Sequence, residues 1–331
     1  MRNPKLQTMR GKFNNRLLLW ILLGLAAIFV VTRLTRVKQT ERTLKTQLVE
    51  IDTSRVSSIL LYPLAEQGKE IKFSRNGSAW RVSMDGTMAA ANGDLVKNIL
   101  AELQDLKVEQ LVARSPDSWD HYQVTDSLGT RIVVNEGKNK ALDLVVGRFH
   151  YRQAPGGYNM YGQNRGTGKT YIRLSGDKEV YLADGFLAMS VNQRFDRWRD
   201  QTVTRLNASS LSRILWDYPA DSGFIAERTG TGWLVGGLPA DSASMDSFLR
   251  KVSRLNHAAF AKATAASTRP DFSVTFEGDN MQAQSIRAFL QTDSTLLLHS
   301  SFNPDTWFSI TRDGLFLDLF PGLSALLPDT G

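Results

Sequence analysis

A chain of 331 residues is longer than a typical single domain, and its 42% hydrophobic content, with seven Trp and sixteen Phe, can fill two cores. The net charge of +7 suggests a nucleic-acid-binding protein, but residues 1–46 hold ten of the 40 basic and one of the 33 acidic residues. These residues carry +9 and the rest of the chain carries −2, which offers nucleic acid no electrostatic surface there. The absence of cysteine excludes disulfides, thiolate metal sites and cysteine nucleophiles.

The first predicted element is a membrane anchor. Sixteen uncharged residues, LLLWILLGLAAIFVVT, lie between Arg16 and Arg33. As a helix they span about 24 Å, and snorkelling arginines together with Leu34 extend this toward the bilayer thickness. We therefore expect a single transmembrane helix over 17–34. It follows a basic cytoplasmic tail over 1–16 and precedes a juxtamembrane linker over 35–50.

A cleaved signal peptide is the alternative explanation of this segment. The apolar run continues past Ala26 and Ala27, however, and no small-x-small cleavage site follows it. Five basic residues precede the segment and five follow it by residue 45, so charge alone does not orient the helix. Glu41 and the free amino terminus favour a cytoplasmic N-terminus, which would place the rest of the chain outside the cytoplasm.

After residue 50 the chain repeats itself. The segment IDTSRVSSILLYP matches LNASSLSRILWDYP, and the short strand AWRV matches GWLV; these four segments lie at 51–63, 206–219, 79–82 and 232–235. The second pair aligns Trp80 with Trp233, and we expect both rings to pack as structural anchors. The same order of elements in both halves indicates an internal repeat, with units over 51–200 and 201–331.

Each unit continues with an amphipathic helix and then several strands. Apolar residues recur at helical spacing from Leu95 to Leu106, behind a cap at Asn92 or Asp94, and from Met245 to Leu255, behind Ser242 or Ser244. The expected strands that follow are 130–137, 141–146, 171–174 and 180–183 in the first unit, and 272–278, 286–290, 296–299, 308–311 and 315–319 in the second. This pattern predicts an α+β fold of two tandem related units, each a mainly antiparallel sheet covered by one helix.

Two insertions distinguish the first unit, SPDSWDHYQVTDS over 115–127 and the glycine-rich RQAPGGYNMYGQNRGTGKT over 152–170. The second insertion is expected to be a loop, and Tyr151, Tyr158 and Tyr161 make it rich in aromatic residues. Such loops often carry binding functions, so we predict that these tyrosines contact a partner.

Part of this insertion, GQNRGTGKT, resembles a phosphate-binding loop. The motif requires a glycine five residues before Gly168, and that position is Gln163. The following residues, TYIRL, have the pattern of a strand, whereas a phosphate loop leads into a helix. We therefore expect no nucleotide there and no cofactor in the protein.

No catalytic motif is recognisable elsewhere. The four histidines are scattered and belong to no zinc-binding spacing, and no G-x-S-x-G elbow is present. Paired carboxylates can be chosen in any chain with 33 acids, so they give no support for a glycosidase. The sequence predicts no catalytic or metal-ligating residue, although a hydrolase with an unrecognised site remains an alternative.

The segment RFDRWRD, over 194–200, admits two explanations. Its Arg194, Arg197 and Trp198 could form a basic-aromatic strip that docks a partner. Alternatively, it could be a salt-bridged junction between the two units in which Phe195 and Trp198 pack on the sheets. The second explanation is the simpler one.

Several of these segments together resemble a known bacterial family. They are the opening SSILLYP, the stretch SWDHYQVTDSLGTRIVVNEGKNKALDLVVGRF over 118–149, then TYIRLSGDKEVYLADGFL and RWRDQTV. This pattern is similar to the domain-of-unknown-function family four-three-four-zero, over about 50–320 and most clearly in the first unit. The resemblance implies structural roles for Trp119, Tyr122 and Gly147. The two aromatic side chains would pack in the fold, and the glycine would permit a turn.

The resemblance implies a membrane-anchored protein of the bacterial inner membrane whose soluble part lies in the periplasm. Such proteins are often encoded beside the subunits of gliding-type ABC transporters, and no activity is implied. We therefore expect a non-enzymatic accessory or interaction subunit whose partners are the membrane and the integral subunits of an ABC-type complex. A module that binds envelope glycan or peptide is the second hypothesis.

Overall fold

The computed structural model describes residues 48–158 and 164–328, except for residues 263, 266 and 293, together with residues 22 and 24–26. The predicted transmembrane span over 17–34 lies outside these residues, apart from 22 and 24–26, which are helical. Among the described residues, no helix has both the length and the apolar character that crossing a bilayer requires.

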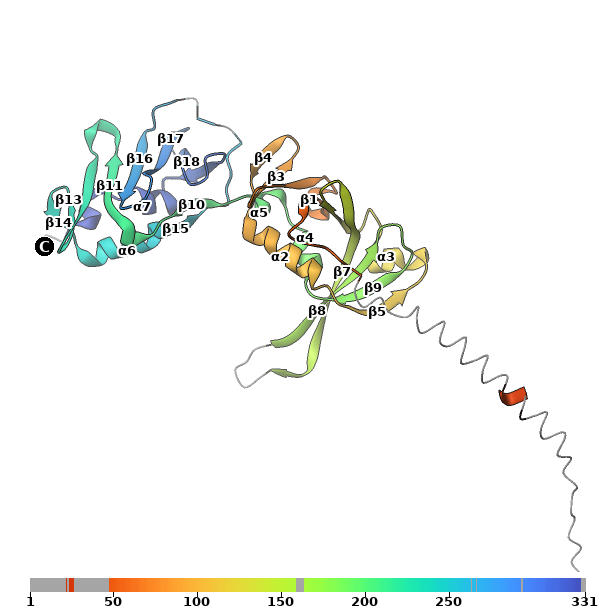
Figure 1. Cartoon of the computed structure of the whole chain (residues 1–331). Helices are drawn as coiled ribbons and strands as arrows, with labels where there is room; N and C mark the ends of the chain where they lie inside the picture. The colour runs from red at the N-terminus through yellow and green to blue at the C-terminus, as the bar shows by residue number, and fades with distance from the viewer. Residues whose placement is uncertain are drawn as a thin grey trace, which may run out of the picture.

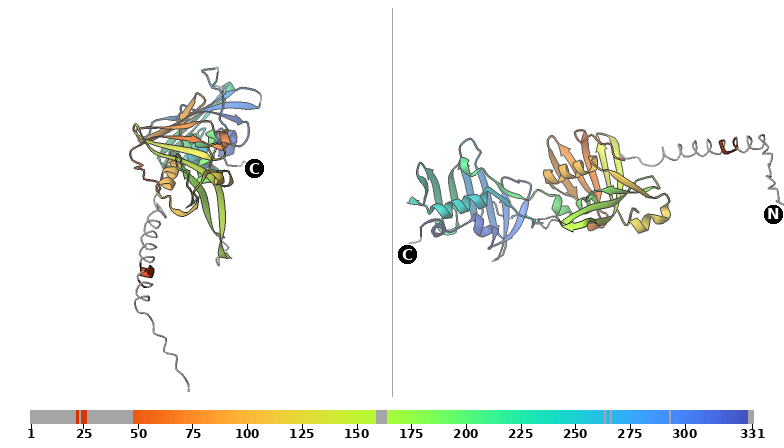
Figure 2. Two further views of the ribbon diagram at one scale, coloured as in Figure 1. Left: turned by 90° about the vertical axis from the view of Figure 1, so that its right-hand side faces the viewer. Right: turned by 90° about the horizontal axis from the view of Figure 1, so that it is seen from below.

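The fold is mainly antiparallel β-structure with a few short helices, built around two large sheets that follow one another along the chain (Figures 1 and 2). The first sheet has nine strands in the order β4-β3-β2-β1-β6-β7-β8-β9-β5, and the second has eight in the order β14-β13-β12-β11-β16-β17-β18-β19. A third sheet consists only of β10 and β15. We call the parts of the chain around the two large sheets the first unit and the second unit.

The first unit comprises β1 (Val56–Tyr62), β2 (Ile71–Asn76), β3 (Ala79–Met84), β4 (Thr87–Ala90), β5 (Val108–Ala113), β6 (Thr130–Glu136), β7 (Asn139–Tyr158), β8 (Asn164–Leu174) and β9 (Val180–Asp184). Its helices are α2 (Gly93–Gln104), α3 (Trp119–Tyr122), α4 (Leu187–Val191) and α5 (Phe195–Trp198).

The second unit comprises β11 (Leu211–Asp217), β12 (Phe224–Thr229), β13 (Gly232–Val235), β14 (Leu238–Pro239), α6 (Ser242–Ser253), β16 (Phe272–Gly278), β17 (Gln284–Leu290), β18 (Thr295–Ser300), β19 (Trp307–Thr311) and α7 (Leu315–Leu319). The two-stranded sheet pairs β10 (Thr202–Arg205) with β15 (Arg254–Asn256).

The two large sheets share their strand order, and the likeness extends to the register of their central strands. In the first sheet, Ile59 of β1 pairs with Val134 of β6 after an irregularity between Val56 and Ser58. In the second sheet, Ile214 of β11 pairs with Phe276 of β16 after the same kind of irregularity, between Leu211 and Arg213. The bulge therefore recurs at the position that the sequence alignment makes equivalent.

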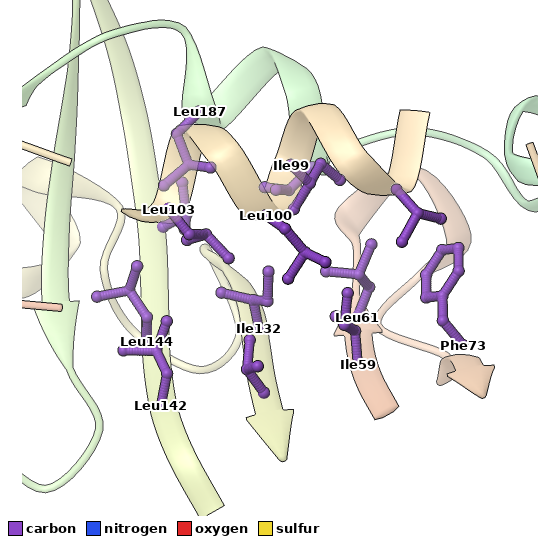
Figure 3. Packing of buried hydrophobic residues seen from close by; sticks show 14 of the residues in the cluster. Ile59, Leu61, Phe73, Ile99, Leu100, Leu103, Ile132, Leu142, Leu144 and Leu187 are labelled. Atoms are coloured by element: carbon purple, nitrogen blue, oxygen red, sulfur yellow. The ribbon is translucent and has the colours of Figure 1, made fainter. Parts of the chain in front are cut away.

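Helix α2 lies across one face of the first sheet, and its apolar side chains meet those of the strands (Figure 3). Its buried residues are spaced i, i+3, i+4 and i+7, the spacing of one helix face; they are Val96, Ile99, Leu100 and Leu103. The side chain of Asn92 caps the helix by accepting a hydrogen bond from the Leu95 amide. Burial of each such side chain contributes about 1.5–3 kcal/mol.

Helix α6 repeats this arrangement with Met245, Phe248, Leu249 and Val252 buried. Its cap differs from the prediction of Ser242 or Ser244, because the Asp241 side chain accepts the hydrogen bond from the Ser244 amide. Asp241 has extended backbone angles, whereas Ser242 is already helical. The helix therefore begins one residue earlier than the serines alone suggest.

The two tryptophans that the sequence aligns occupy equivalent positions. Trp80 pairs across the strands with Arg75, and Trp233 pairs in the same way with Arg228. Each guanidinium lies over its ring, at 5.5 Å and 5.0 Å from the ring centroid. Both arginines also donate to backbone carbonyls just before the first central strand, such as that of Ser54 and that of Ala208.

The cores of the two units are separate. The first draws on buried side chains from Val49 to Trp198, and the second on side chains from Val203 to Leu326. The exact bounds of 51–200 and 201–331 stay a prediction.

Two predicted elements are wrong. Residues 315–319 form the helix α7 rather than a strand: Phe316 and Leu319, three residues apart, are buried, while Leu317 between them is 59% exposed. The insertion over 152–170 was expected to be a loop, but most of it continues strands β7 and β8. Glycines and polar residues there obscured the alternation that identifies strands.

Candidate functional site: the arm of the first unit and its base

The most distinctive feature of the first unit is a hairpin that extends away from its sheet (Figure 1). Strand β7 pairs with β6 only up to Val146, and β8 pairs with β9 only from Lys169 onward. Beyond these points, Tyr151–Tyr158 and Asn164–Gly168 pair only with each other. We call these two segments the arm; in the described part of the chain, the second sheet has no counterpart.

An ion-pair cluster fixes the arm where it leaves the sheet. Lys169, whose side chain is 7% exposed, contacts Asp184 and lies 2.9 Å from Glu109. Burial alone would lower the pKa of Lys169, but the hydrogen bonds with Asp184 and Glu109 outweigh it and raise the pKa. The lysine therefore stays charged and ties β8 to β5 and β9 at the root of the arm.

Aromatic residues pack on the backbone beside this cluster. Phe186 stacks on Phe149, with ring centroids 5.5 Å apart and planes inclined by 29°. Its ring also covers Gly168, where an added Cβ would lie only 2.8 Å from the ring. Phe186 remains 47% exposed, and Tyr151, paired with Gly168, is 44% exposed. The root of the arm thus presents apolar surface to solvent.

This surface continues into a groove of about 380 Å³ at the base of the arm, which we call the basal groove. Three of its lining side chains are large, apolar and exposed: Leu64 at 43%, Leu128 at 41% and Met189 at 55%. Arg148, Phe149, Asn192 and Gln193 complete much of the lining. Because adjacent exposed apolar side chains of this size typically mark interaction sites, this groove is the best candidate for partner contact in the first unit.

The structure describes the three tyrosines predicted to contact a partner to different extents. Tyr151 is exposed at the root of the arm. The backbone of Tyr158 pairs with Asn164 near the arm's end. The side chain of Tyr158 and all of Tyr161 lie outside the described residues.

The other predicted contact residues lie elsewhere. The side chain of Arg194 is 80% exposed and 4.0 Å from Glu66, and Arg197 is also exposed. Trp198 is only 1% exposed and packs edge-on against Phe73, with centroids 5.3 Å apart. Its ring therefore belongs to the first core and offers no surface to a partner, as the simpler explanation of this segment expects.

Two of the residues predicted to be structural belong to a small core on the other face of the first sheet. Trp119 and Tyr122 pack there with three buried valines: Val124, Val145 and Val180. The Trp119 indole donates to the Lys178 carbonyl at 3.0 Å, and the Arg173 guanidinium lies 4.0 Å from the centre of its ring. The insertion over 115–127 therefore caps this face of the sheet.

Gly147 serves a different purpose from the predicted turn, because it lies within β7. An added Cβ would collide with the Tyr122 carbonyl oxygen and lie 2.6 Å from Val124 and 2.9 Å from the Gln123 oxygen. The glycine is needed because the backbone of the α3 segment passes directly over it.

The described residues contain no group of three or more His, Asp or Glu side chains that could hold a metal ion. Gly168–Thr170, the end of the phosphate-loop-like segment, lie within β8 and precede no helix. Sequence reasoning did not identify Leu64, Leu128 or Met189. Their apolar character was visible, but their exposure and proximity arise only when α4 folds beside β7.

The family model for Domain of unknown function (DUF4340) matches residues 80–271 of this chain, which is more than half of it. The chain belongs to this family. The DUF4340 match is narrower than the 50–320 expected from the sequence; it begins in β3, includes the arm and ends just before β16. No curated protein and no solved structure matches the chain.

Proposed function

We propose that this DUF4340 protein is a non-enzymatic, membrane-anchored interaction subunit whose soluble part lies in the periplasm and binds integral subunits of an ABC-type transport complex. The basal groove is the observation that carries the proposal, because Leu64, Leu128 and Met189 expose apolar surface beside a projecting arm. The predicted inner-membrane anchor over 17–34 supports it, since tethering raises the local concentration of a weak binder near a membrane partner. The resemblance supports the transporter association.

We also infer that the two units are tandem repeats of one α+β unit, each with its covering helix. The shared strand order and the two Arg–Trp contacts support this inference. In this account the repeated framework provides stability, and the additions to the first unit provide contact surface.

The proposal can be tested by affinity purification of the full-length chain from its native membranes in mild detergent. We expect ABC-type membrane subunits, identified by mass spectrometry, to co-purify with the wild-type chain. Met189→Asp should lose them, because a carboxylate in the groove must be desolvated against an apolar partner. Met88→Asp is the matched control, since Met88 is 59% exposed on β4, outside the groove. Equal recovery with Met189→Asp and with wild type would reject the groove as the contact.

A second candidate is an envelope glycan- or peptide-binding module, which the exposed Tyr151 favours because aromatic rings stack on sugars and peptides. Tyr151→Ala should then abolish retention on isolated cell-wall material without changing the melting temperature. Unchanged retention would reject this candidate.

A further inference from the structure

A second groove, of about 700 Å³, lies between the two units, and we call it the junction groove. On one side are β3, β4 and the first turn of α2; on the other is the two-stranded sheet of β10 and β15. Several contacts beside the groove hold the two units together. Arg81 forms an ion pair with Asp305 at 3.0 Å, and the Asn303 amide donates to the Asp200 carbonyl at 2.8 Å. The Arg199 guanidinium stacks on Phe260 at 3.6 Å.

The charges that line the junction groove are predominantly positive. Four cationic residues, Lys97, Arg197, Arg205 and Arg254, face two carboxylate residues, Asp94 and Asp200. All four cationic side chains are exposed, and within the described part of the chain none forms an ion pair within 4.0 Å. The groove therefore concentrates unpaired positive charge in a soluble part whose sequence carries a net negative charge.

Two of these cations oppose each other directly. Arg205 of β10 and Arg254 of β15 are cross-strand partners in the two-stranded sheet. Like charges at directly opposite positions destabilise a sheet. Neither arginine forms an ion pair within 4.0 Å among the described residues, and the only side-chain partner of Arg205 there is the Thr202 hydroxyl at 3.4 Å. The pair is explained if an anionic group binds between the two guanidinium groups.

The remaining lining identifies the kind of anion. Asn92, Gln201 and Asn256 offer amide groups that both donate and accept hydrogen bonds, and Asp94 and Asp200 are acceptors. A phosphate ion binds mainly through donors and would be repelled by the carboxylates, whereas a polypeptide has backbone N–H groups that donate to them. A glycan would favour an exposed aromatic face, but the one aromatic residue of the lining, Trp80, is 4% exposed.

We infer that the junction groove binds an acidic segment of a partner polypeptide, with its carboxylates held by Arg205, Arg254 and Lys97. The inference deepens the proposed function by adding a second contact with a partner protein. It does not depend on the basal groove.

The test measures binding of an octaglutamate peptide, labelled with a neutral dye, to the full-length chain in nonionic detergent. The wild-type chain should bind it more tightly than an uncharged Gly/Ser octapeptide, and added salt should weaken the binding. The variant R205Q/R254Q should weaken octaglutamate binding by about tenfold or more. The matched control R269Q/R287Q removes two exposed arginines of the second unit that lie outside the groove, and it should bind within about twofold of wild type.

A stability measurement distinguishes a binding pair from a structural one. If the two arginines repel each other in the free chain and serve to bind an anion, R205Q/R254Q should raise the melting temperature of the free chain. The same variant should weaken the peptide complex. A lowered melting temperature would show that the arginines serve the fold and would overturn the inference. Equal binding of octaglutamate by R205Q/R254Q and wild type, or equal binding of the uncharged peptide, would also overturn it.

Competition with inorganic phosphate completes the test. Added phosphate should displace bound octaglutamate no more than chloride does at the same ionic strength. Displacement by phosphate beyond that caused by chloride would assign the groove to a small anion and reject the peptide. A chain that co-purifies with transporter subunits but does not bind octaglutamate would refute this inference and leave the proposed function standing. A chain that binds octaglutamate but co-purifies with no transporter subunit would support this inference and refute the proposed function.

Discussion

The first and second units share a framework and differ in what is attached to it. Both arrange their strands in the same order, place a twelve-residue helix after the fourth strand, and set an arginine over a tryptophan at equivalent positions. The first unit alone adds the arm and the small core around Trp119 on the other face of its sheet. The comparison separates residues that build the repeated sheet from residues available for contact.

The units also use the strand after the helix differently. In the first unit, β5 joins the edge of its own sheet by pairing with β9. In the second, β15 pairs instead with β10, directly after the segment that joins the units. That change leaves a two-stranded sheet facing the first unit and creates the junction groove. The strand after the helix thus extends the edge of its own sheet in the first unit, whereas in the second unit it lines a surface between the units.

The largest expected effects test whether the two cores are independent. Phe73 and Phe276 are 1% and 0% exposed, one in each core. Phe73→Ala and Phe276→Ala should each reduce the unfolding free energy of their own unit by about 3–5 kcal/mol, from lost burial and the cavity left behind. Hydrogen–deuterium exchange should show faster exchange in β1 and β2 for Phe73→Ala, but not in β16 and β17. Equal acceleration in both units would show that they unfold as one.

A smaller effect tests how much the small core around Trp119 contributes to the stability of the first unit. Gly147→Ala forces a Cβ against the backbone of the α3 segment and should cost about 1–3 kcal/mol. Urea unfolding monitored by tryptophan fluorescence would measure the loss. Gly93→Ala is the control, because no atom lies within 4 Å of an added Cβ there. A Gly147→Ala chain as stable as wild type would mean that the α3 segment moves aside freely.

The Arg–Trp contact that occurs once in each unit gives a third comparison. Arg75→Met and Arg228→Met remove the cation above each tryptophan and the hydrogen bonds to the preceding turn, at a cost of about 1 kcal/mol each. The loss should be greater for Arg75→Met, because Trp80 is buried whereas Trp233 is only half-buried. Thermal melts of the two variants would show the order. A larger loss for Arg228→Met would contradict the claim that burial of the tryptophan sets the strength of the contact.

The smallest predicted effect is the contribution of Asp143, in the first unit, to the pH dependence of stability. Burial tends to raise the pKa of Asp143, but hydrogen bonds from Arg131 and Lys140 outweigh it and lower the pKa. A lowered pKa in the folded state gives stability that is present above the unfolded pKa and is lost as pH falls through the folded value. The loss below about pH 4 should stay below about 1 kcal/mol.

Urea unfolding at pH 5 and pH 3 would measure this effect. Asp143→Asn should reduce the acid-dependent loss in the first unit. By strand register the second unit has Ser285 at the equivalent position, so its acid sensitivity should not change. An identical pH dependence in wild type and Asp143→Asn would contradict the prediction.

The repeated framework could be predicted from the sequence because its signals are local. The aligned tryptophans, the helical spacing after Asn92 and the apolar runs of β6 and β16 each identify an element directly. The five residues of α7 did not, because a short apolar run fits a strand or a helix equally well. The arm was hidden by its glycines and polar residues, which carry no alternating pattern.

The candidate sites were less predictable because they depend on contacts between distant segments. Leu64, Leu128 and Met189 meet only through tertiary packing. Arg205 and Arg254 face each other because β15 pairs with β10 rather than with its own sheet, and no propensity specifies that choice. Trp198 shows the reverse case: its motif suggested a docking strip, and burial assigns it to the core.

The central claim is that the basal groove of the first unit, rather than the exposed edge strand β14 of the second unit, contacts a membrane partner. Site-specific photo-crosslinking in native membranes tests it most directly, with the photoreactive residue placed at position 189 or at position 238. Both native side chains are exposed, Met189 at 55% and Leu238 at 56%. The account predicts a crosslink to an ABC-type membrane subunit from position 189 and none from position 238. A crosslink from position 238 alone would contradict it.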